Sequence, residues 1–355
     1  MIIKLREAAQ SYDKIIKVIK NGGIIAIPTD TVYGFAVDGK NPQAVDRLIR
    51  LKKRDDRPFT FFIAQDRIKN YAVITKPRII ESFIPGPLTV ILKKRQNVSL
   101  PLIEEKLGIR IPETDFVINL LERFDSVLAV TSANISGEPP IISPYEIVER
   151  FPEIEVVVDA GMLNTQVSTV LDLTTTPPTL KRKGAVSLLE LERVYGRPVL
   201  MDKGLRFNVL FVCTGNTCRS PMASGILKTL IEPQYCEVDS AGTSAVSGLP
   251  PARFAMDVVK EYGGSIEEHR TKYLTYELIA RADLILVMEM KHYDAVLELS
   301  SKARTKTFLL REYKRGTGKK EVPDPVGRDR SAYEEVARIM LPILKRVAQD
   351  IERHF

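Results

Sequence analysis

The sequence predicts two α/β domains that meet near residue 200, and three observations lead to this prediction. The chain has 355 residues, enough for two domains of ordinary size. Short apolar runs typical of buried strands recur along it and are separated by turns that contain Pro or Gly. After residue 200 these strands begin to alternate regularly with helices. We therefore expect one domain at 1–198, a linker at 199–205 and a second domain at 206–355.

The first domain is predicted to be an α/β region with many strands and no regular βαβ repeat. Apolar runs with Pro and Gly between them predict its strands, and 3.6-residue periodicity predicts one helix at 42–54. The strands are expected within 22–30, 59–64, 88–94, 107–112, 126–134, 154–161, 168–174 and 180–185.

The second domain is predicted to contain a parallel sheet with helices on both faces. Strands are expected at 206–213, 237–242, 282–288 and 306–310, and helices at 221–231, near 251–262 and from about 331. In this architecture ligands bind beyond the carboxyl ends of the strands. The site of this domain is therefore expected just after one of its strands.

Composition describes an ordinary soluble protein, with 44% hydrophobic and 27% charged residues. No apolar run is long enough to span a bilayer, and the N-terminal residues do not resemble a signal peptide. Three cysteines are too few for a disulfide framework, so we expect a cytoplasmic protein without membrane contacts. Residues 40–95 contain 14 Lys/Arg against 5 Asp/Glu, which suits an anionic partner, although a solvated helix face is the commoner cause.

The segment CTGNTCRSP (213–221) follows the first strand of the second domain. The N–H groups of such a turn and of the helix after it form an anion cradle, and their field is expected to lower the pKa of the Cys213 thiol. Arg219 can bind two phosphate oxygens, and Ser220 can hydrogen-bond the thiolate. This spacing indicates phosphoryl transfer through a phosphocysteine; the alternative is a buried structural cysteine.

A general acid must then protonate the leaving group, and Asp324 in the Pro-flanked segment VPDPVG (322–327) is the candidate. With it, residues 206–355 resemble the low-molecular-weight protein phosphatases. The phosphate loop, DSAGT (239–243), EEHRTKYLT (267–275), ADLILVMEMKH (282–292) and the DP of the acid loop all correspond.

This resemblance implies a doubly wound, four-stranded parallel sheet and a reaction that needs no cofactor. It makes Cys213 the nucleophile, Arg219 the phosphate clamp and Asp324 first the acid and then the base. The remaining loop residues would shape the cradle and its specificity, with Asn216 and Ser220 ordering it; they are Thr214, Gly215, Asn216, Thr217 and Cys218. His269 matches a structural position.

The phosphorylated residue that the loop accepts is predicted from two features. Tyrosine-directed members commonly have C-L-G-N-I-C-R, with aromatic residues after the acid, whereas Thr214 and Thr217 stand in this loop and Val326 follows Asp324-Pro325. CTGNTCR resembles a bacterial branch that dephosphorylates arginine, since Thr217 offers a small hydroxyl to a polar guanidinium. We expect phosphoarginine ahead of phosphotyrosine; the alternative is a neutral exchange of two β-branched residues.

Cys218 is expected to protect the nucleophile by forming a disulfide with Cys213 on oxidation, and simple filling of the loop is the alternative. Arsenate reduction also occurs on this fold, but it relies on further cysteines on a mobile segment. Only Cys236 remains, so this activity is not favoured.

The first domain has no Walker loop, no GxGxxG and no metal-spaced cluster, and by residue chemistry alone it offers only a candidate anion pocket. Its motifs nevertheless occur in the order of the threonylcarbamoyl-AMP synthase (YrdC-like) family. They are PTDTVYG (28–34), K-x-R (52–54), PGPLTVIL (85–92), GIRIP (108–112), TSANISG (131–137), STV-x-D (168–172) and R-x-G-A (182–185).

This resemblance covers about residues 10–190 and implies a twisted mixed-sheet α/β fold. It implies synthesis of threonylcarbamoyl-AMP and pyrophosphate from L-threonine, bicarbonate and ATP with Mg²⁺, for tRNA modification. Lys52 and Arg54 would face phosphates, and Thr31 and Tyr33 the threonine. The nucleotide would be contacted by Ser132, Asn134, Ser168 and Arg182.

The spacer after K-x-R, residues 55–58, is about one residue shorter than usual and contains two acids, as in the YciO-like branch. Two hypotheses therefore stand: a bifunctional enzyme, or a phosphotyrosine phosphatase fused to an inactive RNA- or nucleotide-binding module. The partners expected for the bifunctional enzyme are phosphorylated proteins, the three small substrates, and tRNA or tRNA-modification proteins.

Overall fold

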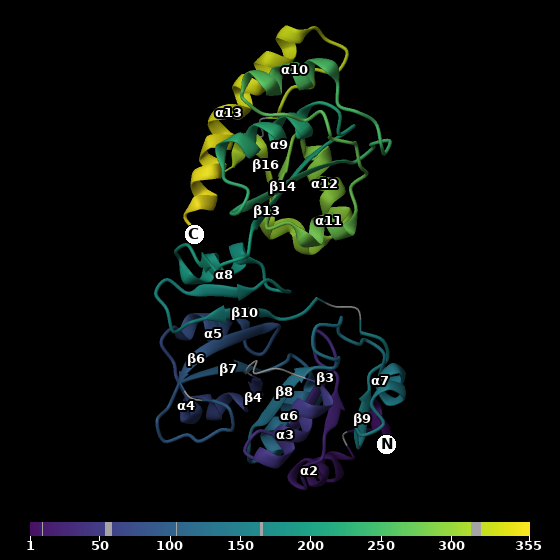
Figure 1. The fold of residues 1–355 in the computed structure, drawn as a ribbon, viewed down its shortest axis with the longest axis vertical. Coiled ribbons are helices and arrows are strands. Elements are labelled where there is room, and N and C mark those ends of the chain that lie inside the picture. Colours follow the sequence, from purple (N-terminus) through teal and green to yellow (C-terminus); the bar gives the residue numbers. More distant parts are fainter. Residues whose placement is uncertain (9, 54–58, 104, 164–165, 314–320) are drawn as a thin grey trace. The chain divides into compact units, whose positions relative to one another are not determined.

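The computed structural model of the chain describes residues 1–8, 10–53, 59–103, 105–163, 166–313 and 321–355. It has two compact units, Met1–Val199 (unit 1) and Leu200–Phe355 (unit 2) (Figure 1). Residues 199–205, expected as a linker, include the short strand β12 (Leu200–Met201), and Met201 N donates to His354 O at 2.7 Å. The ordered part of unit 2 thus begins before residue 206.

Unit 1 is built on a mixed sheet. Its strands are β1 (Ile2–Lys4), β2 (Ile25–Ile27), β3 (Gly34–Asp38), β4 (Thr60–Phe62), β5 (Ala72–Val73), β6 (Leu88–Lys94), β7 (Lys106–Arg110), β8 (Leu128–Ser132), β9 (Val156–Asp159), β10 (Thr169–Asp172) and β11 (Thr179–Arg182). They lie in the order β1-β9-β2-β3-β8-β4-β7-β6-β10-β11, with β5 on β6. The sheet contains parallel pairs, such as β6 with β10, and antiparallel pairs, such as β3 with β8, which confirms the predicted mixed sheet.

Several helices of unit 1, namely α3, α6, α7 and α8, begin at a residue whose side chain caps the first turn. Asn41 accepts hydrogen bonds from the N–H groups of Gln43 and Ala44, with Pro in the first turn of α3. Ser187 and Glu190 form a capping box at α8. The helices are α1 (Leu5–Ala8), α2 (Tyr12–Lys20), α3 (Pro42–Leu51), α4 (Ile68–Tyr71), α5 (Pro77–Phe83), α6 (Asp115–Arg123), α7 (Pro144–Arg150) and α8 (Leu188–Tyr195), with a 3₁₀ turn at Gln65–Arg67.

Unit 2 has a four-stranded sheet in the order β14-β13-β15-β16, in which every pair is parallel. The strands are β13 (Phe207–Cys213), β14 (Cys236–Gly242), β15 (Leu284–Val287) and β16 (Thr307–Leu309). The helices are α9 (Arg219–Leu230), α10 (Arg253–Glu261), α11 (Tyr276–Arg281), α12 (Met290–Leu299) and α13 (Arg330–Glu352), with 3₁₀ turns at Ser301–Lys306 and Leu310–Glu312. The predicted parallel sheet is confirmed.

The helices of unit 2 cover both faces of this sheet. Figure 1 shows α9, α10 and α13 on one face and α11 and α12 on the other. β13 lies between β14 and β15, and its buried residues have apolar side chains or, at its end, the Cys213 thiol. Phe211 and Val212 are completely buried. The carboxyl end of β13 lies between the two layers of helices, and Cys213 is its last residue.

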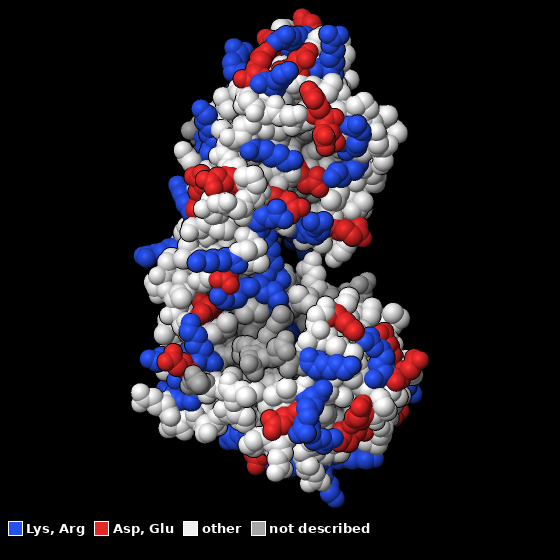
Figure 2. Space-filling view, viewed as in Figure 1, with Lys and Arg blue, Asp and Glu red and all other residues white. Residues whose placement is uncertain are grey.

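Lys and Arg side chains are interspersed with Asp and Glu over the displayed face of each unit (Figure 2). This mixture agrees with the modest formal net charge of +7. In the part of the chain that is described, no helix is both long and apolar enough to cross a bilayer.

Candidate active sites

Unit 2 holds its candidate site in the turn between β13 and α9. The carbonyl oxygens of Cys213 and Thr214 accept hydrogen bonds from Thr243 N (2.9 Å) and Ser244 N (3.0 Å), which fixes the start of the turn to the chain after β14. α9 begins at Arg219 without a side-chain cap. No side chain therefore competes for its first amides, and the Ser220 amide is bonded to the Cys213 sulfur.

Asn216 gives the turn its shape. Its backbone is left-handed, with φ of 56°, which asparagine tolerates better than most residues. Its side-chain N–H₂ donates to Ser220 Oγ and Ser240 Oγ, both at 2.9 Å, and its Oδ1 accepts from Lys272 N at 2.9 Å. His269 Nε2 donates to the Asn216 carbonyl at 2.9 Å. The side chain and backbone of Asn216 are thus both held by the segments around the loop.

Cys213 is buried and has donors around its sulfur. Ser220 Oγ lies 2.9 Å from the sulfur, and the Asn216 N–H donates to it at 3.2 Å. Burial raises the pKa of the Cys213 thiol, whereas Ser220, the loop amides and the Arg219 charge lower it. The net direction is upward, which corrects the expected lowering: these groups oppose desolvation without outweighing it.

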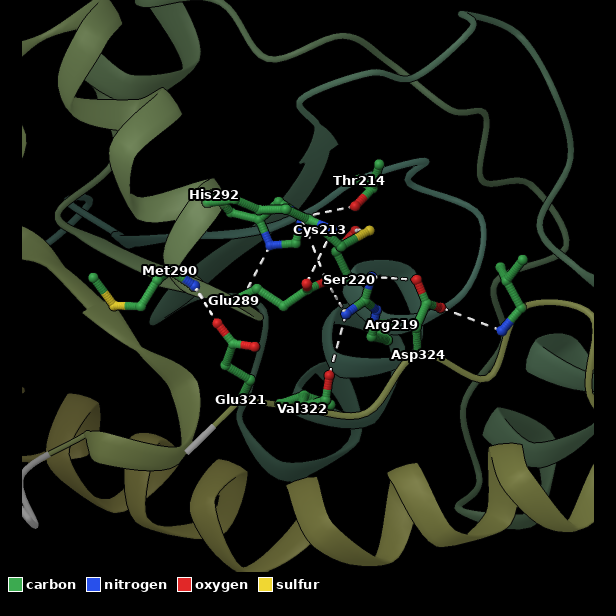
Figure 3. Close-up of polar contacts among 12 residues, drawn as sticks. Cys213, Thr214, Arg219, Ser220, Glu289, Met290, His292, Glu321, Val322 and Asp324 are labelled. Carbon is green, nitrogen blue, oxygen red and sulfur yellow. Dashed lines mark hydrogen bonds and ion pairs between the residues drawn. The ribbon is translucent and has the colours of Figure 1, made fainter. Parts of the chain in front are cut away.

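Arg219 is almost completely buried between two carboxylates. Its Nη1 donates to Glu289 Oε1 (2.5 Å) and to the Val322 carbonyl (3.1 Å), while its Nη2 donates to Asp324 Oδ2 (2.5 Å). Figure 3 shows this arrangement beside Cys213. The predicted clamp and the predicted acid are therefore brought together, although 105 residues separate them along the chain.

The acid loop is fixed to the end of β15. Val322 N donates to Met288 O at 2.9 Å, and Met290 N donates to Glu321 Oε1 at 2.9 Å. The Asp324 side chain is 44% exposed, so it can exchange protons with water. Val326, which follows the acid loop, is 60% exposed.

The other predicted loop residues lie at the same turn. Thr217 Oγ1 lies 3.5 Å from Cys218 Sγ, and the Tyr333 hydroxyl lies 3.5 Å from the same sulfur. Cys213, Cys218 and Cys236 all lie in the described part of the chain, and none of them forms a disulfide there. A disulfide between Cys213 and Cys218 stays a prediction.

Two residues of this site were not singled out from the sequence. Glu289 and His292 form the N-terminal capping box of α12. The Glu289 carboxylate also accepts a hydrogen bond from Arg219, and His292 Nε2 lies 2.8 Å from Thr214 Oγ1. The sequence could have indicated Glu289 by its position, because an acidic residue between the end of a predicted parallel strand and a helix lies at the edge of the sheet where ligands bind.

We expect unit 2 to lose stability as the pH falls from about 6.5 to about 4. Burial lowers the pKa of His292 from 6.5 to about 4 in the fold, so in this window the unfolded chain binds the proton more readily than the folded one. The loss should approach roughly 3 kcal/mol at the acid end. Chemical denaturation at a series of pH values checks it: His292→Gln should lack this dependence, and an unchanged dependence would contradict the assignment.

Gly242 lies directly beneath the phosphate loop. A Cβ at this position would approach Thr214 O to 2.5 Å and Asn216 N to 3.0 Å. Only the absence of a side chain permits this close approach.

Unit 1 holds its candidate site in a cavity of about 380 Å³. The predicted residues that the structure describes all line it: Thr31, Tyr33, Lys52, Ser132, Asn134, Ser168 and Arg182. Arg54 lies outside the described residues. The motifs thus converge from strand ends far apart in the chain.

Lys52 joins two of these motifs. Its ammonium group donates to the Ser132 carbonyl (2.5 Å) and to Asn134 Oδ1 (2.7 Å), and Ser132 Oγ donates to the same Oδ1 at 2.6 Å. Lys52 is buried, at 2% exposure. This cation is therefore held in a fixed place in the cavity wall.

Ser168 and Arg182 form a second contact in the cavity. Arg182 donates to the Ser168 carbonyl (3.0 Å) and hydroxyl (2.8 Å), and Thr89 Oγ1 lies 3.1 Å from Ser168 Oγ. A Cβ on Gly184 would meet the Ser168–Thr169 backbone at 2.4 Å. The glycine of R-x-G-A thus allows the two segments to touch.

Thr31 and Tyr33 lie in the loop between β2 and β3. Thr31 Oγ1 lies 2.9 Å from Thr29 Oγ1, whereas the Tyr33 hydroxyl donates to Gly161 O (2.8 Å) and accepts from Ala160 N (3.0 Å). Burial raises the pKa of Tyr33 to about 12, so this phenol is neutral. Tyr33 therefore ties the loop after β9 to the cavity wall.

Arg110 is a cavity residue that was not singled out from the sequence. It comes from β7, donates to Gly86 O (3.2 Å) and forms a buried ion pair with Asp30. Burial lowers the pKa of Arg110, and the Asp30 carboxylate acts in the opposite direction. The sequence could have indicated Arg110 through its place in GIRIP, where it is the one charged residue of an otherwise apolar segment.

We expect Asp30→Asn to destabilise unit 1 by about 3 kcal/mol, because it leaves the buried Arg110 charge without its counterion. Thermal unfolding followed by circular dichroism measures this, and the transition of unit 1 should shift while that of unit 2 does not. Asp66→Asn is the matched control: the Asp66 side chain is 84% exposed, and its carboxylate lies 4.0 Å from Arg67 Nε, at the outer limit of an ion pair. Equal effects of the two variants would show that the pair does not stabilise unit 1.

Among the described residues no group of three His, Cys, Asp or Glu side chains could hold a metal ion. The cavity of unit 1 instead offers Lys52, Arg110 and Arg182 together with hydroxyl and amide groups. Such a donor set suits a polyanion.

Two family models match the chain, one in each unit. The model for the Sua5, YciO and YrdC proteins, described as "Telomere recombination", matches residues 17–184. The model described as "Low molecular weight phosphotyrosine protein phosphatase" matches residues 208–354.

Curated relatives are found for both units. The chain is 34% identical to the threonylcarbamoyl-AMP synthase of Pyrococcus abyssi, over 55% of this chain and 61% of that protein. It is 31% identical to a Methanocaldococcus jannaschii protein named "Putative threonylcarbamoyl-AMP synthase", over 54% of this chain and 97% of that protein. It is 35% identical to the low-molecular-weight protein-tyrosine-phosphatase Etp of Escherichia coli K12, over 41% of this chain and 93% of that protein. The chain thus spans less than two thirds of the Pyrococcus synthase.

Two solved structures are similar to the whole chain or to part of it. Sua5 of P. abyssi complexed with L-threonine shares the fold, with a TM-score of 0.54, 21% identity and coverage of 98% of both chains. The YwlE arginine phosphatase of Geobacillus stearothermophilus matches 41% of this chain and 93% of its own, with 36% identity and a TM-score of 0.39. From these matches and the two sites, the chain belongs to the threonylcarbamoyl-AMP synthase family through its first half and to the low-molecular-weight protein phosphatase family through its second.

Proposed function

We propose that unit 2 hydrolyses phosphorylated protein side chains through a phosphocysteine on Cys213. The observation that carries this proposal is the contact of Arg219 with Asp324 beside a sulfur that already has two hydrogen-bond donors. The turn and the acid loop thus combine a nucleophile, an anion clamp and a proton donor, which are the three parts that covalent phosphoryl transfer requires.

In the first step the Cys213 thiol gives its proton to a phosphoryl oxygen of the substrate and attacks phosphorus as the thiolate, and the bond to the leaving group breaks. Asp324 gives its proton to the leaving atom, while the loop amides and Arg219 balance the charge on the phosphoryl oxygens. In the second step water attacks phosphorus and gives a proton to Asp324. The sulfur–phosphorus bond then breaks, phosphate leaves, and Ser220 stabilises the thiolate that is released.

For the substrate we propose phosphoarginine ahead of phosphotyrosine, on the basis of Thr217 in the loop. The test is kcat/KM of the full chain on matched phosphoarginine and phosphotyrosine peptides, with Cys213→Ser as the control. A higher value for phosphoarginine supports the proposal, and a higher value for phosphotyrosine contradicts this preference. Activity that survives Cys213→Ser contradicts the covalent mechanism.

For unit 1 we propose synthesis of threonylcarbamoyl-AMP from L-threonine, bicarbonate and ATP. Lys52, Arg110 and Arg182 line one cavity, and their charges suit a triphosphate. Mg²⁺, bound through the nucleotide phosphates, would neutralise charge on them. Thr31 and Tyr33 would face the threonine, and Ser132, Asn134 and Ser168 the nucleotide. Phosphoproteins, tRNA and tRNA-modification proteins are the partners that the two activities would require.

Pyrophosphate release from ATP that depends on both threonine and bicarbonate tests this proposal. Its absence from a folded protein would favour the other candidate, an RNA- or nucleotide-binding module. That candidate rests on the short acidic spacer at residues 55–58. Retained RNA binding without turnover would establish it.

A further inference from the structure

His292 connects the phosphate loop to the start of α12 (Figure 3). Its ring is completely buried, and each ring nitrogen has a partner. The Glu289 N–H donates to Nδ1 at 3.1 Å, and Nε2 lies 2.8 Å from Thr214 Oγ1. Both partners belong to the phosphatase site, since Glu289 also holds Arg219 and Thr214 directly follows Cys213.

These contacts determine where the ring proton is. A backbone N–H can only donate, so Nδ1 must accept and carries no hydrogen. In a neutral ring the proton is then on Nε2, which donates to Thr214 Oγ1. Burial keeps the ring neutral: it lowers the pKa of His292 to about 4, and Arg219 and Lys291 also lower it, whereas Glu289 and Asp324 act in the opposite direction.

The direction of these bonds determines what Thr214 can do. Its oxygen already accepts the imidazole proton, and among the described residues no acceptor is recorded for its own hydroxyl hydrogen. A hydroxyl that accepts one hydrogen bond becomes a stronger donor in the next. The Thr214 hydroxyl and the Cys213 sulfur lie on the same side of the His292 ring in Figure 3. A phosphoryl group bound at Cys213 would bring oxygen acceptors to this donor.

We propose that His292 is a positioning residue of the phosphatase site, which orients the Thr214 hydroxyl as an additional donor to the phosphoryl oxygens. The proposal rests on the phosphatase function proposed above. It does not depend on the leaving group, because the contact is with phosphoryl oxygen. Thr214 is then a general anion contact rather than part of the discrimination between arginine and tyrosine.

The first test measures kcat/KM on p-nitrophenyl phosphate and competitive inhibition by inorganic phosphate. Thr214→Val, which removes only the hydroxyl, should lower kcat/KM about tenfold and weaken inhibition by phosphate in parallel, as expected for one lost hydrogen bond to an anion. Thr214→Ser should retain most activity. His292→Leu should match Thr214→Val, and the double variant should be no worse than either. His292→Gln, which keeps a donor, should restore most of the activity.

The second test uses the unaltered protein. The chain has three histidines, so ring ¹⁵N signals can be assigned with His→Gln variants. His292 should remain neutral with its proton on Nε2 from pH 8 to pH 5. A proton on Nδ1, or a charged ring near pH 6, would overturn the proposal.

In the kinetic test, full additivity of Thr214→Val and His292→Leu would overturn the proposal, as would an unchanged inhibition constant for phosphate in Thr214→Val. Failure of the proposed function itself gives a different result: Cys213→Ser would then retain activity in the same assay.

Discussion

Replacing Arg219 with Lys is expected to lower kcat/KM of the phosphatase reaction about 10³-fold. The guanidinium makes three directed contacts, with Glu289, Val322 and Asp324, and a single ammonium cannot reproduce this planar fork. The lysine ammonium would therefore not be held in one orientation toward the phosphoryl oxygens, and the contact that brings Asp324 to the site would be lost. Steady-state kinetics on p-nitrophenyl phosphate measures the effect.

Arg281→Lys provides the matched control, because the Arg281 side chain is 67% exposed and, within the described residues, is bonded only to Glu237. It is also remote from the loop in sequence. Its kcat/KM should remain within a factor of two of the unaltered enzyme, as surface ion pairs contribute little. If Arg219→Lys kept activity within tenfold, the planar clamp would not be needed and the proposed role of Arg219 would be wrong.

Replacing Lys52 with Met is expected to abolish pyrophosphate release in unit 1. The ammonium group is held by the Ser132 carbonyl and Asn134 Oδ1, and the variant removes the fixed charge while keeping a side chain of similar length. A loss of about 10³-fold is expected where one preorganised charge faces the reacting group. The rate of threonine- and bicarbonate-dependent pyrophosphate release measures it.

Lys53→Met is the control for this experiment, since Lys53 is the next residue and is exposed. Circular dichroism should show both variants folded, although Lys52→Met removes the hydrogen bonds of the ammonium group to the Ser132 carbonyl and Asn134 Oδ1, at a cost of about 1–3 kcal/mol. If both variants were equally active, Lys52 would have only a structural role.

The sequence predicted the elements whose apolar runs are long or whose boundaries are marked. β6 (Leu88–Lys94) has the predicted bounds, and β13 lies within the expected run. β3 (Gly34–Asp38) was not separated from the motif before it, because Gly34 and the polar end of this short strand hide its alternation. The mixed sheet of unit 1 was predicted only through the family resemblance, and the order of its strands was not predicted, since register between distant strands is not visible in local patterns.

The site residues likewise fall into those that local sequence predicts and those that depend on how distant segments pack. Cys213, Arg219 and the residues of the loop follow from local spacing, and Asp324 from a Pro-flanked turn. Glu289 and His292 were missed because their role depends on where α12 begins relative to the loop. The pKa of Cys213 was predicted in the wrong direction, since desolvation depends on how many atoms cover the sulfur, and neighbours in sequence do not show this.

Gly242 and Gly184 have a common consequence for how this sequence can vary. Each lies against the backbone of a site loop from a different stretch of chain, one beneath Thr214 and one against Ser168. In a saturation library selected for either activity, these two positions should tolerate fewer substitutions than the catalytic hydroxyls beside them. A Ser can be exchanged for Thr with partial function, whereas any Cβ at these glycines would displace main-chain atoms of the site itself.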